Sequence, residues 1–234
     1  MSRIVHIALK CENMEDLEKA TKFYNDIFGI YTTKEKHARG HLSRHMTDGN
    51  IDLALMLYDS EDEKEAKLAG PGIQIHHIGV EVADRPSMIK KIEDNGGTIF
   101  SDRAEGALKY FSPDGTLGEI VAAGRYPVKE RSKLSRIANV SYNVKNLDKS
   151  VDFYKNVFDF AELPSAKRGQ RVLTDGQTTL TFNEGGDRPA IISWGLAVKD
   201  PAAVAEQVAK HGGTVVPGGF RGPDGNIGEL VKVA

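Results

Sequence analysis

The sequence predicts an α+β protein built from four copies of one unit, in which a strand is followed by a helix and about three further strands. Three pairs of similar segments indicate this: 17–30 with 147–160, 92–100 with 208–216, and 112–124 with 222–234. The first pair shows apolar residues at helical spacing, and the last pair begins with a Pro-Asp-Gly turn. Similar segments that recur along a chain indicate repeated structural units. The two halves of the chain are therefore expected to share one fold.

Each half divides again, because four segments are typical of a strand that leads directly into a helix. They are RIVHIALKC, IHHIGVEVA, IANVSYNVK and ISWGLAVKD, and the helices are expected at roughly 16–30, 86–95, 147–158 and 201–211. Further strand-like runs follow each helix. The repeat predicts one domain at residues 1–124 and another at 135–234, joined by a polar and basic linker at 125–134.

The composition is ordinary for a globular chain, with 40% hydrophobic and 27% charged residues. A formal net charge of −2 gives no electrostatic reason to expect nucleic acid or an anionic membrane as a partner. Cys11 is the only cysteine, which excludes an intrachain disulfide and favours a reducing compartment. The sequence shows neither an apolar leader nor a run of about 18 apolar residues. We expect a cytoplasmic monomer or homodimer.

The first strands of the four units can be compared position by position. Because side chains alternate between faces along a strand, each first strand has an almost entirely apolar face, which is expected to pack on the helices. The opposite face carries a polar residue followed, two positions later, by a small one. The polar residues are His6, His77, Asn139 and Ser193, and the small ones are Ala8, Gly79, Ser141 and Gly195. Small residues leave room for a cup lined by the sheet.

His6 and His77 thus occupy equivalent positions on the cup face, whereas His76 lies on the packing face. Glu119 stands in the segment TLGEIVAAG, where a carboxylate among apolar neighbours is costly unless it is paired or coordinated. His6, His77 and Glu119 make a set of two histidines and one carboxylate, which holds one face of a metal and leaves other positions open. An exposed edge-strand glutamate is the alternative for Glu119.

The second half carries a reduced version of this set. Its equivalents are Asn139, Ser193 and Glu229. Glu229 recurs although both histidines are missing, so the glutamate belongs in part to the repeated pattern itself. That half is expected to be structural or to bind a ligand without a metal.

The basic stretch KHARGHLSRHMTDG holds three of the seven histidines. If it forms a strand, His41 and His45 share one face and Arg44 lies on the other. We predict His45 as a catalytic general base and His41 as a substrate contact, provided that their face lines the cup. Arg39 and Arg44 are candidates to bind an anionic group of the substrate. A solvated polar loop is the alternative.

The four units, the histidines in the first strands and the PDGxxGE strand resemble the vicinal oxygen chelate superfamily. This superfamily includes glyoxalase I, extradiol ring-cleaving dioxygenases, methylmalonyl-CoA epimerase, and fosfomycin and bleomycin resistance proteins. The resemblance covers essentially the whole chain and implies two glyoxalase-like domains, each a half-barrel of two βαβββ modules. It also implies a divalent metal between the modules, with the family ligands carried over onto His6, His77 and Glu119.

Glyoxalase I and the epimerase usually have a fourth ligand on the last strand of the first unit. Counting four residues past Gly49, as Glu119 lies four past Gly115, gives Leu53, with Asp52 as its neighbour. Three ligands therefore resemble the extradiol and fosfomycin-modifying enzymes more than glyoxalase I.

Extradiol enzymes also carry a catalytic histidine and a tyrosine before the last strand. Tyr110 stands nine residues before Glu119 and is a candidate acid or hydrogen-bond donor, although a neighbouring position fits the pattern better. An aromatic wall residue is the alternative. In many extradiol enzymes the second domain is the catalytic one, whereas here the complete set lies in the first.

The resemblance implies a mononuclear metal-dependent enzyme, with an extradiol-type dioxygenase acting on a small oxygen-chelating substrate as the leading hypothesis. Fe(II) is the metal expected for that reaction. Mn, Ni or Zn would support a glyoxalase- or epimerase-type isomerase or a thiol transferase. The alternative from another class is a non-catalytic protein that binds a drug. No residues are assigned to an organic cofactor.

Overall fold

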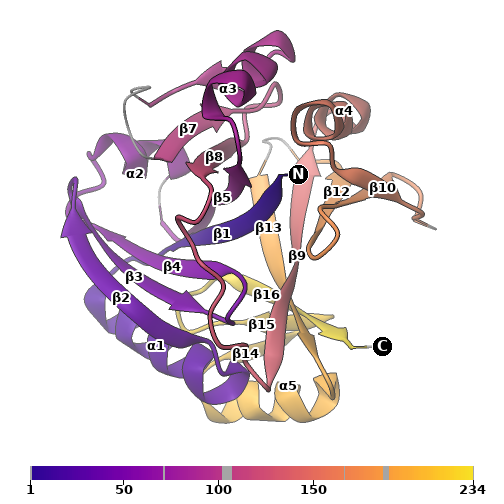
Figure 1. The fold of residues 1–234 in the computed structure, drawn as a ribbon. Helices are drawn as coiled ribbons and strands as arrows, with labels where there is room; N and C mark the ends of the chain where they lie inside the picture. Colours follow the sequence, from indigo (N-terminus) through magenta and orange to yellow (C-terminus); the bar gives the residue numbers. More distant parts are fainter. Residues whose placement is uncertain (1, 71, 102–106, 166, 187–189, 234) are drawn as a thin grey trace. The chain divides into compact units, whose positions relative to one another are not determined.

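The computed structural model describes residues 2–70, 72–101, 107–165, 167–186 and 190–233. Its order of elements is a strand, a helix and three strands, four times over, with one short extra helix in the first half (Figure 1). The helices in the described residues are α1 (Met14–Phe28), α2 (Lys64–Ala69), α3 (Arg85–Asp94), α4 (Leu147–Phe158) and α5 (Pro201–Lys210). The α+β class and the repeated modules predicted from the sequence are confirmed.

Each half forms one mixed sheet, and the described residues give each sheet eight strands. The first sheet has the order β2-β3-β4-β1-β5-β8-β7-β6. Its strands are β1 (Arg3–Lys10), β2 (Tyr31–Ala38), β3 (His41–Thr47), β4 (Asp52–Tyr58), β5 (Gln74–Val82), β6 (Thr98–Ile99), β7 (Ala107–Phe111) and β8 (Leu117–Ala122).

The second sheet repeats this order as β10-β11-β12-β9-β13-β16-β15-β14. Its strands are β9 (Ser135–Val144), β10 (Ala161–Leu163), β11 (Gln170–Thr174), β12 (Thr179–Glu184), β13 (Ala190–Val198), β14 (Thr214–Val216), β15 (Gly219–Arg221) and β16 (Ile227–Lys232). Residues 125–134, predicted as the linker, form neither helix nor strand.

Four of the helices begin directly after an asparagine or aspartate whose side chain caps the first turn. Asn13, Asp84, Asn146 and Asp200 precede α1, α3, α4 and α5, and each side chain accepts a hydrogen bond from a backbone N–H of the first turn. Asparagine and aspartate are preferred at this position because they satisfy amides that have no partner within the helix. No helix among the described residues combines the length and apolar character needed to cross a membrane.

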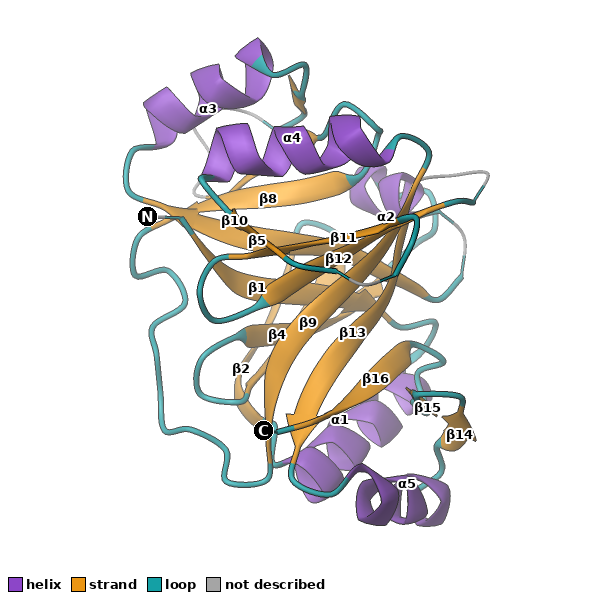
Figure 2. Cartoon of the chain, turned by 90° about the vertical axis from the view of Figure 1, so that its right-hand side faces the viewer, coloured by secondary structure: helices purple, strands orange, loops and turns teal. Residues whose placement is uncertain are grey.

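The chain divides into two compact units that group the modules differently from their order in the sequence. The α3/α4 unit consists of the start of β1 up to Val5, His77–Pro127 and Asn139–Ile192. The α1/α5 unit consists of His6–His76, Val128–Ala138 and Ser193–Ala234. The first unit thus holds the second and third modules, and the other holds the first and fourth. Figures 1 and 2 show α1 beside α5 within its unit.

Aromatic side chains fill the core of each unit between sheet and helices. In the α1/α5 unit, Phe28 stacks on Phe220 with 5.1 Å between ring centroids, and Tyr24 meets Trp194 at 5.3 Å. In the α3/α4 unit, Tyr142 stacks on Phe182 at 4.9 Å. Trp194 and Tyr142 lie on the first-strand faces that the sequence pattern assigns to the core. Burial of such faces is the main stabilising term for the modules.

Candidate metal site

The strand pair β1–β4 positions His6 and its surroundings in the α1/α5 unit. The two strands are parallel, with His6 opposite Asp52 and Ala8 opposite Ala54. Residues opposite each other in a sheet point to the same face. His6 and Asp52 are both buried. The cup face of this module therefore begins with a histidine beside a carboxylate, which the sequence comparison of first strands did not reveal.

Asp52 binds two histidines through one oxygen atom. Its Oδ1 lies 2.8 Å from Nδ1 of His6 and 2.7 Å from Nδ1 of His45. Burial alone would raise the pKa of the Asp52 carboxyl, but the hydrogen bonds from His45 and His6 outweigh it and the pKa is lowered overall. Asp52 is therefore a carboxylate at neutral pH. The sequence offered it only as a neighbour of a possible fourth ligand.

The strand pair β5–β8 positions His77 and Glu119 in the α3/α4 unit. Gly79 lies opposite Glu119 in this parallel pair. Nε2 of His77 is 2.7 Å from Oε2 of Glu119, and both residues are almost completely buried. Two cis ligands, each about 2.1 Å from a metal, are about 3 Å apart. The pair therefore fits a divalent metal in spacing and in donor chemistry. His6 belongs to the other unit, so a ligand set that joins it with this pair is a proposal.

Lys109 is the charged neighbour of Glu119 that sequence reasoning missed. In the antiparallel pair β7–β8, Lys109 lies opposite Glu119, and its Nζ is 3.5 Å from Oε2. Lys109 is also buried. Counting outward from the Pro-Asp-Gly turn as a hairpin would have paired the two residues. The carboxylate thus has an ammonium group on one side and an imidazole on the other.

Tyr110 lies on the opposite face of the same strand. It is fully buried, and its ring packs on Phe153 and Phe158 of α4, at 6.0 and 5.9 Å between centroids. Burial raises the pKa of its hydroxyl well above the ordinary value. Because strand side chains alternate, Tyr110 cannot share the face of Glu119. This position favours a core residue over the catalytic role predicted for Tyr110.

The histidine-rich stretch forms the hairpin β2–β3. The register of β3 with β4 places His45 opposite Ala54 and His41 opposite Tyr58, so both histidines lie on the cup face. The ring of His41 is 5.2 Å from that of Tyr58. Arg39 lies in the turn before β3 with a left-handed φ of 57°, next to Gly40. The alternation predicted from the sequence holds here.

Arg44 points to the other face of β3, toward α1. Its guanidinium pairs with Glu18 of α1 at 2.8 Å and with Glu35 of β2 at 2.6 Å. In the second half, Arg171 makes the same kind of contacts with Asp148 of α4 and with a glutamate of the preceding strand. This arrangement recurs in a half that has neither histidine, which favours a structural role for Arg44 over the predicted substrate contact.

The position equivalent to Glu119 in the first module is Ala54. Ala8 and Gly79 are repeat mates, and they lie opposite Ala54 and Glu119. Counting from the turn gave Leu53 instead, because the loop after Gly49 is one residue longer than its mate. An alanine offers no ligand atom.

In the second sheet, Asn139 and Ser193 stand where the first sheet has its two histidines, and both side chains are hydrogen-bonded. Oδ1 of Asn139 accepts hydrogen bonds from the hydroxyls of Thr179 and Thr181, at 2.8 and 2.9 Å. In the other unit, the hydroxyl of Ser193 donates to Glu229. The reduced set is thus hydrogen-bonded within the protein.

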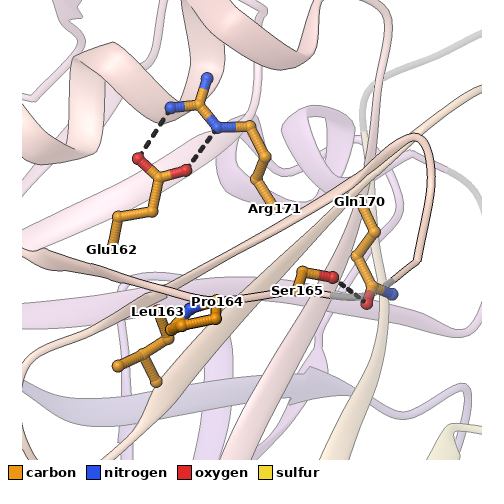
Figure 3. Close-up of a pocket in the computed structure, with 6 residues that line it drawn as sticks. All are labelled: Glu162, Leu163, Pro164, Ser165, Gln170 and Arg171. Carbon is orange, nitrogen blue, oxygen red and sulfur yellow. Dashed lines mark hydrogen bonds and ion pairs between the residues drawn. The ribbon is translucent and has the colours of Figure 1, made fainter.

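A surface pocket of about 340 Å³ lies in the second half on β10 and β11 (Figure 3). Glu162 and Arg171 face each other there through two hydrogen bonds of 2.7 and 2.8 Å. Hydrogen bonds from Arg171 and Lys155 lower the pKa of Glu162 to about 2. The pocket therefore contains a partly exposed ion pair and none of the residues predicted for the site.

Comparison with protein families gives a match to the model described as Glyoxalase/Bleomycin resistance protein/Dioxygenase superfamily, over residues 3–120 and 136–230. A search of the curated proteins finds no match. Among solved structures, a mutant 4-hydroxymandelate synthase from Streptomyces coelicolor is similar, with a TM-score of 0.77 and 14% identity over 98% of this chain and 92% of that one.

Two further structures are similar along the whole chain. The Mn(II)-bound glyoxalase from Novosphingobium aromaticivorans has a TM-score of 0.72 and 16% identity, over 99% of this chain and 83% of that one. The 2,3-dioxygenase LapB from Pseudomonas sp. KL28 has a TM-score of 0.70 and 13% identity, over 99% and 92%. At these identities the likeness is one of fold.

Proposed function

Because the chain belongs to the glyoxalase, bleomycin resistance protein and dioxygenase superfamily, we propose that it is a mononuclear metal-dependent enzyme with His6, His77 and Glu119 as ligands. The observation that carries the proposal is the buried His77–Glu119 pair, whose ligand atoms are 2.7 Å apart. His6 occupies the repeat position of His77, and β1 and β5 are neighbours in the sheet. Imidazole nitrogens and a carboxylate oxygen are the donors of the set.

When bound, a divalent metal would act as a Lewis acid and as a template for two oxygen atoms of a substrate. Two histidines and one carboxylate are the donor set typical of Fe(II) oxygenases, so Fe(II) is favoured, with Mn, Ni or Zn as alternatives. The alanine at position 54 supports three ligands rather than four.

The chain's own residues add charge and proton transfer to this site. Lys109 brings a positive charge to within 3.5 Å of Glu119, which favours a substrate that carries an anionic oxygen. His45 lies on the cup face with one ring nitrogen held by Asp52, and it is the proposed base that accepts a proton from a substrate hydroxyl. His41 lies on the same face, Arg39 lies in the turn before it, and both are the proposed substrate contacts.

The reaction we propose is that of an extradiol-type dioxygenase acting on a small oxygen-chelating substrate. The three-ligand count supports it, as does the likeness to the 2,3-dioxygenase LapB. A glyoxalase- or epimerase-type isomerase or a thiol transferase is the second candidate, and the likeness to the Mn(II)-bound glyoxalase supports that reading. A non-catalytic binding protein is the third, supported by Asn139 and Ser193, which replace both histidines in the second half.

Metal analysis of anaerobically purified protein tests the ligand set. We expect about one divalent metal per chain in wild type, loss of the metal in His77→Ala, and its retention in the matched control His76→Ala. His76 is the control because it is the neighbouring histidine and is not in the proposed ligand set. Its Nε2 instead contacts the carbonyl oxygen of Glu65 at 3.0 Å and the hydroxyl of Tyr58 at 3.1 Å. Metal that persists in His77→Ala would remove the proposed site.

Oxygen uptake with a panel of catechols then tests the reaction. Uptake that depends on Fe(II) and disappears in His77→Ala is the result expected of a dioxygenase. A metal-loaded protein that consumes no oxygen with any diol would favour the isomerase or transferase reading instead. We further propose a monomer or homodimer, since a single chain supplies all three ligands. A cytoplasmic location is proposed because Cys11 is the only cysteine of the sequence.

A further inference from the structure

We infer that Asp52 is a positioning residue that holds His6 and His45 in one tautomer, with the hydrogen on Nδ1 and the lone pair on Nε2 of each ring. The inference deepens the proposed function and rests on it for the role of His6 as a metal ligand. The tautomers themselves follow from contacts within the α1/α5 unit. Asp52 would act through the two rings and need not touch substrate.

The hydrogen bonds to Asp52 fix the tautomer of each ring. Oδ1 of Asp52 lies 2.8 Å from Nδ1 of His6 and 2.7 Å from Nδ1 of His45. An ionised carboxylate only accepts hydrogen bonds, and one oxygen can accept two. Both Nδ1 atoms must therefore be the donors. A neutral imidazole carries one hydrogen, so both Nε2 atoms keep their lone pairs.

Asp52 must itself be held in place if it is to position the two rings. The loop before β4 is fixed by several hydrogen bonds. The carboxylate of Asp48 accepts from the backbone N–H of Asn50 and of Ile51, each at 2.8 Å, and the hydroxyl of Thr47 donates to the carbonyl of Ile51 at 2.7 Å. Asp52 follows this loop directly and is buried. Hydrogen bonds in such low-dielectric surroundings are stronger than in water.

Metal-ligating histidines commonly donate their second ring N–H to a carboxylate, which fixes the orientation of the ring and raises its basicity. Asp52 does this for His6 and, through the same atom, for His45. The two ring centroids are 6.2 Å apart. One carboxylate would thus prepare Nε2 of His6 to bind a metal and Nε2 of His45 to accept a proton.

The same three residues offer a competing arrangement. His6, His45 and Asp52 also form a group whose donor atoms lie within 4.8 Å of one another, a spacing that suits a metal ion. In that arrangement Asp52 and both Nδ1 atoms would be ligands, and the tautomers would be reversed. The two arrangements predict different outcomes in the experiments below.

The tautomers can be read directly in metal-free protein labelled with ¹⁵N-histidine, at an alkaline pH such as 8. Long-range ¹H–¹⁵N spectra, assigned with His6→Gln and His45→Gln, distinguish a protonated from an unprotonated ring nitrogen. We expect Nδ1–H for both rings in wild type. We expect loss of that preference in Asp52→Ala and partial recovery in Asp52→Asn, which keeps an acceptor oxygen. Nε2–H on either ring in wild type overturns the inference without any variant.

Mn(II) binding followed by electron paramagnetic resonance tests the consequence for the metal. We expect Asp52→Asn to weaken binding about 10- to 100-fold, the usual effect of removing such a partner. Asp59→Asn is the matched control, because Asp59 makes a 2.8 Å bond to the exposed His37 of the same unit. That control should bind Mn(II) as wild type does, and His45→Gln should weaken binding far less than Asp52→Asn.

Two other results separate the possible failures. If His45→Gln and Asp52→Asn lose the metal as completely as His6→Ala while His77→Ala keeps it, the metal sits on the competing set and the inference is overturned. If wild type binds no Mn(II) or other divalent metal, the proposed function fails, and the spectra alone then decide whether Asp52 sets the tautomers.

Discussion

The carboxylate of Asp224 accepts a hydrogen bond from the hydroxyl of Tyr24, 200 positions earlier in the chain. The O–O distances are 3.0 and 3.1 Å, and both residues are fully buried. The bond joins the last module to the first. Its repeat mate joins the second module to the third, where Ser150 of α4 donates to Asp114. The aspartate of each Pro-Asp-Gly turn therefore ties its module to the helix of the other module in the same unit.

Stability should depend on pH through Asp224. Burial raises the pKa of its carboxyl to about 6, although Asn226 and Tyr24 donate hydrogen bonds that oppose the shift. A group whose pKa is raised in the folded state stabilises it below the unfolded pKa, near 4, and this contribution is lost as pH rises through about 6. The loss is about 3 kcal/mol at most.

Urea unfolding of wild type and Asp224→Asn at pH 4.5 and pH 8 measures this effect. The variant should gain stability relative to wild type between the two values, because it has no buried charge to desolvate. Asp62→Asn, at a side chain that is 90% exposed, is the control and should follow wild type. An unchanged difference between Asp224→Asn and wild type at both pH values would contradict the prediction.

Substitutions at the adjacent residues Lys109 and Tyr110 should have different effects on ligand affinity. With Mn(II)-loaded protein and oxalate as a probe dianion, Lys109→Met should weaken oxalate binding about 10-fold or more, since a charge-assisted hydrogen bond contributes about 1.5–3 kcal/mol. Tyr110→Phe should bind oxalate as wild type does, because its ring faces α4. Calorimetric titration gives both affinities. Equal effects of the two substitutions would show that the face assignment is mistaken.

The second glycine of the repeated PDGxxGE pattern, Gly118 or Gly228, should be required because the space beside it leaves no room for a side chain. A Cβ at Gly118 would lie 2.3 Å from Cζ of Tyr110, and one at Gly228 would lie 2.2 Å from Cζ of Phe220. In each case an aromatic ring from the neighbouring strand covers the glycine. Gly118→Ala should therefore destabilise the protein by about 1–3 kcal/mol, as overpacking usually does.

Chemical unfolding tests this packing, with the double variant Gly118→Ala/Tyr110→Leu as the check. The smaller side chain makes room for the added methyl group, so the combined loss should be less than the sum of the two single losses. Strict additivity would mean that the glycine is needed for another reason.

Arg44 should contribute modestly to stability and not to ligand binding. Its ion pairs with Glu18 and Glu35 have partly exposed partners, and such pairs usually contribute about 1 kcal/mol or less. Arg44→Gln should therefore lower the free energy of unfolding slightly and leave oxalate affinity unchanged. Arg171→Gln, at the repeat mate, should behave alike. A large loss of oxalate affinity in Arg44→Gln alone would restore the predicted substrate role.

The sequence by itself determined the modules, the faces of their strands and the equivalence of His6 with His77. These features are local: a period of two or 3.6 residues and a repeated turn are written along the chain. Glu119 could be singled out in the same way, because a carboxylate in an apolar strand conflicts with its own neighbours. Helix positions followed for the same reason, from apolar residues at helical spacing.

Only the tertiary structure decided which residues meet across strands and modules. Asp52 reaches His6 because β1 and β4 pair in parallel, and Lys109 rather than Tyr110 reaches Glu119 because of the register of β7 with β8. A shift of one residue in either pairing would exchange the faces. The grouping of the first module with the fourth likewise depends on contacts such as Tyr24 with Asp224. These choices depend on hydrogen-bond register and packing between distant segments, and no local period in the sequence records them.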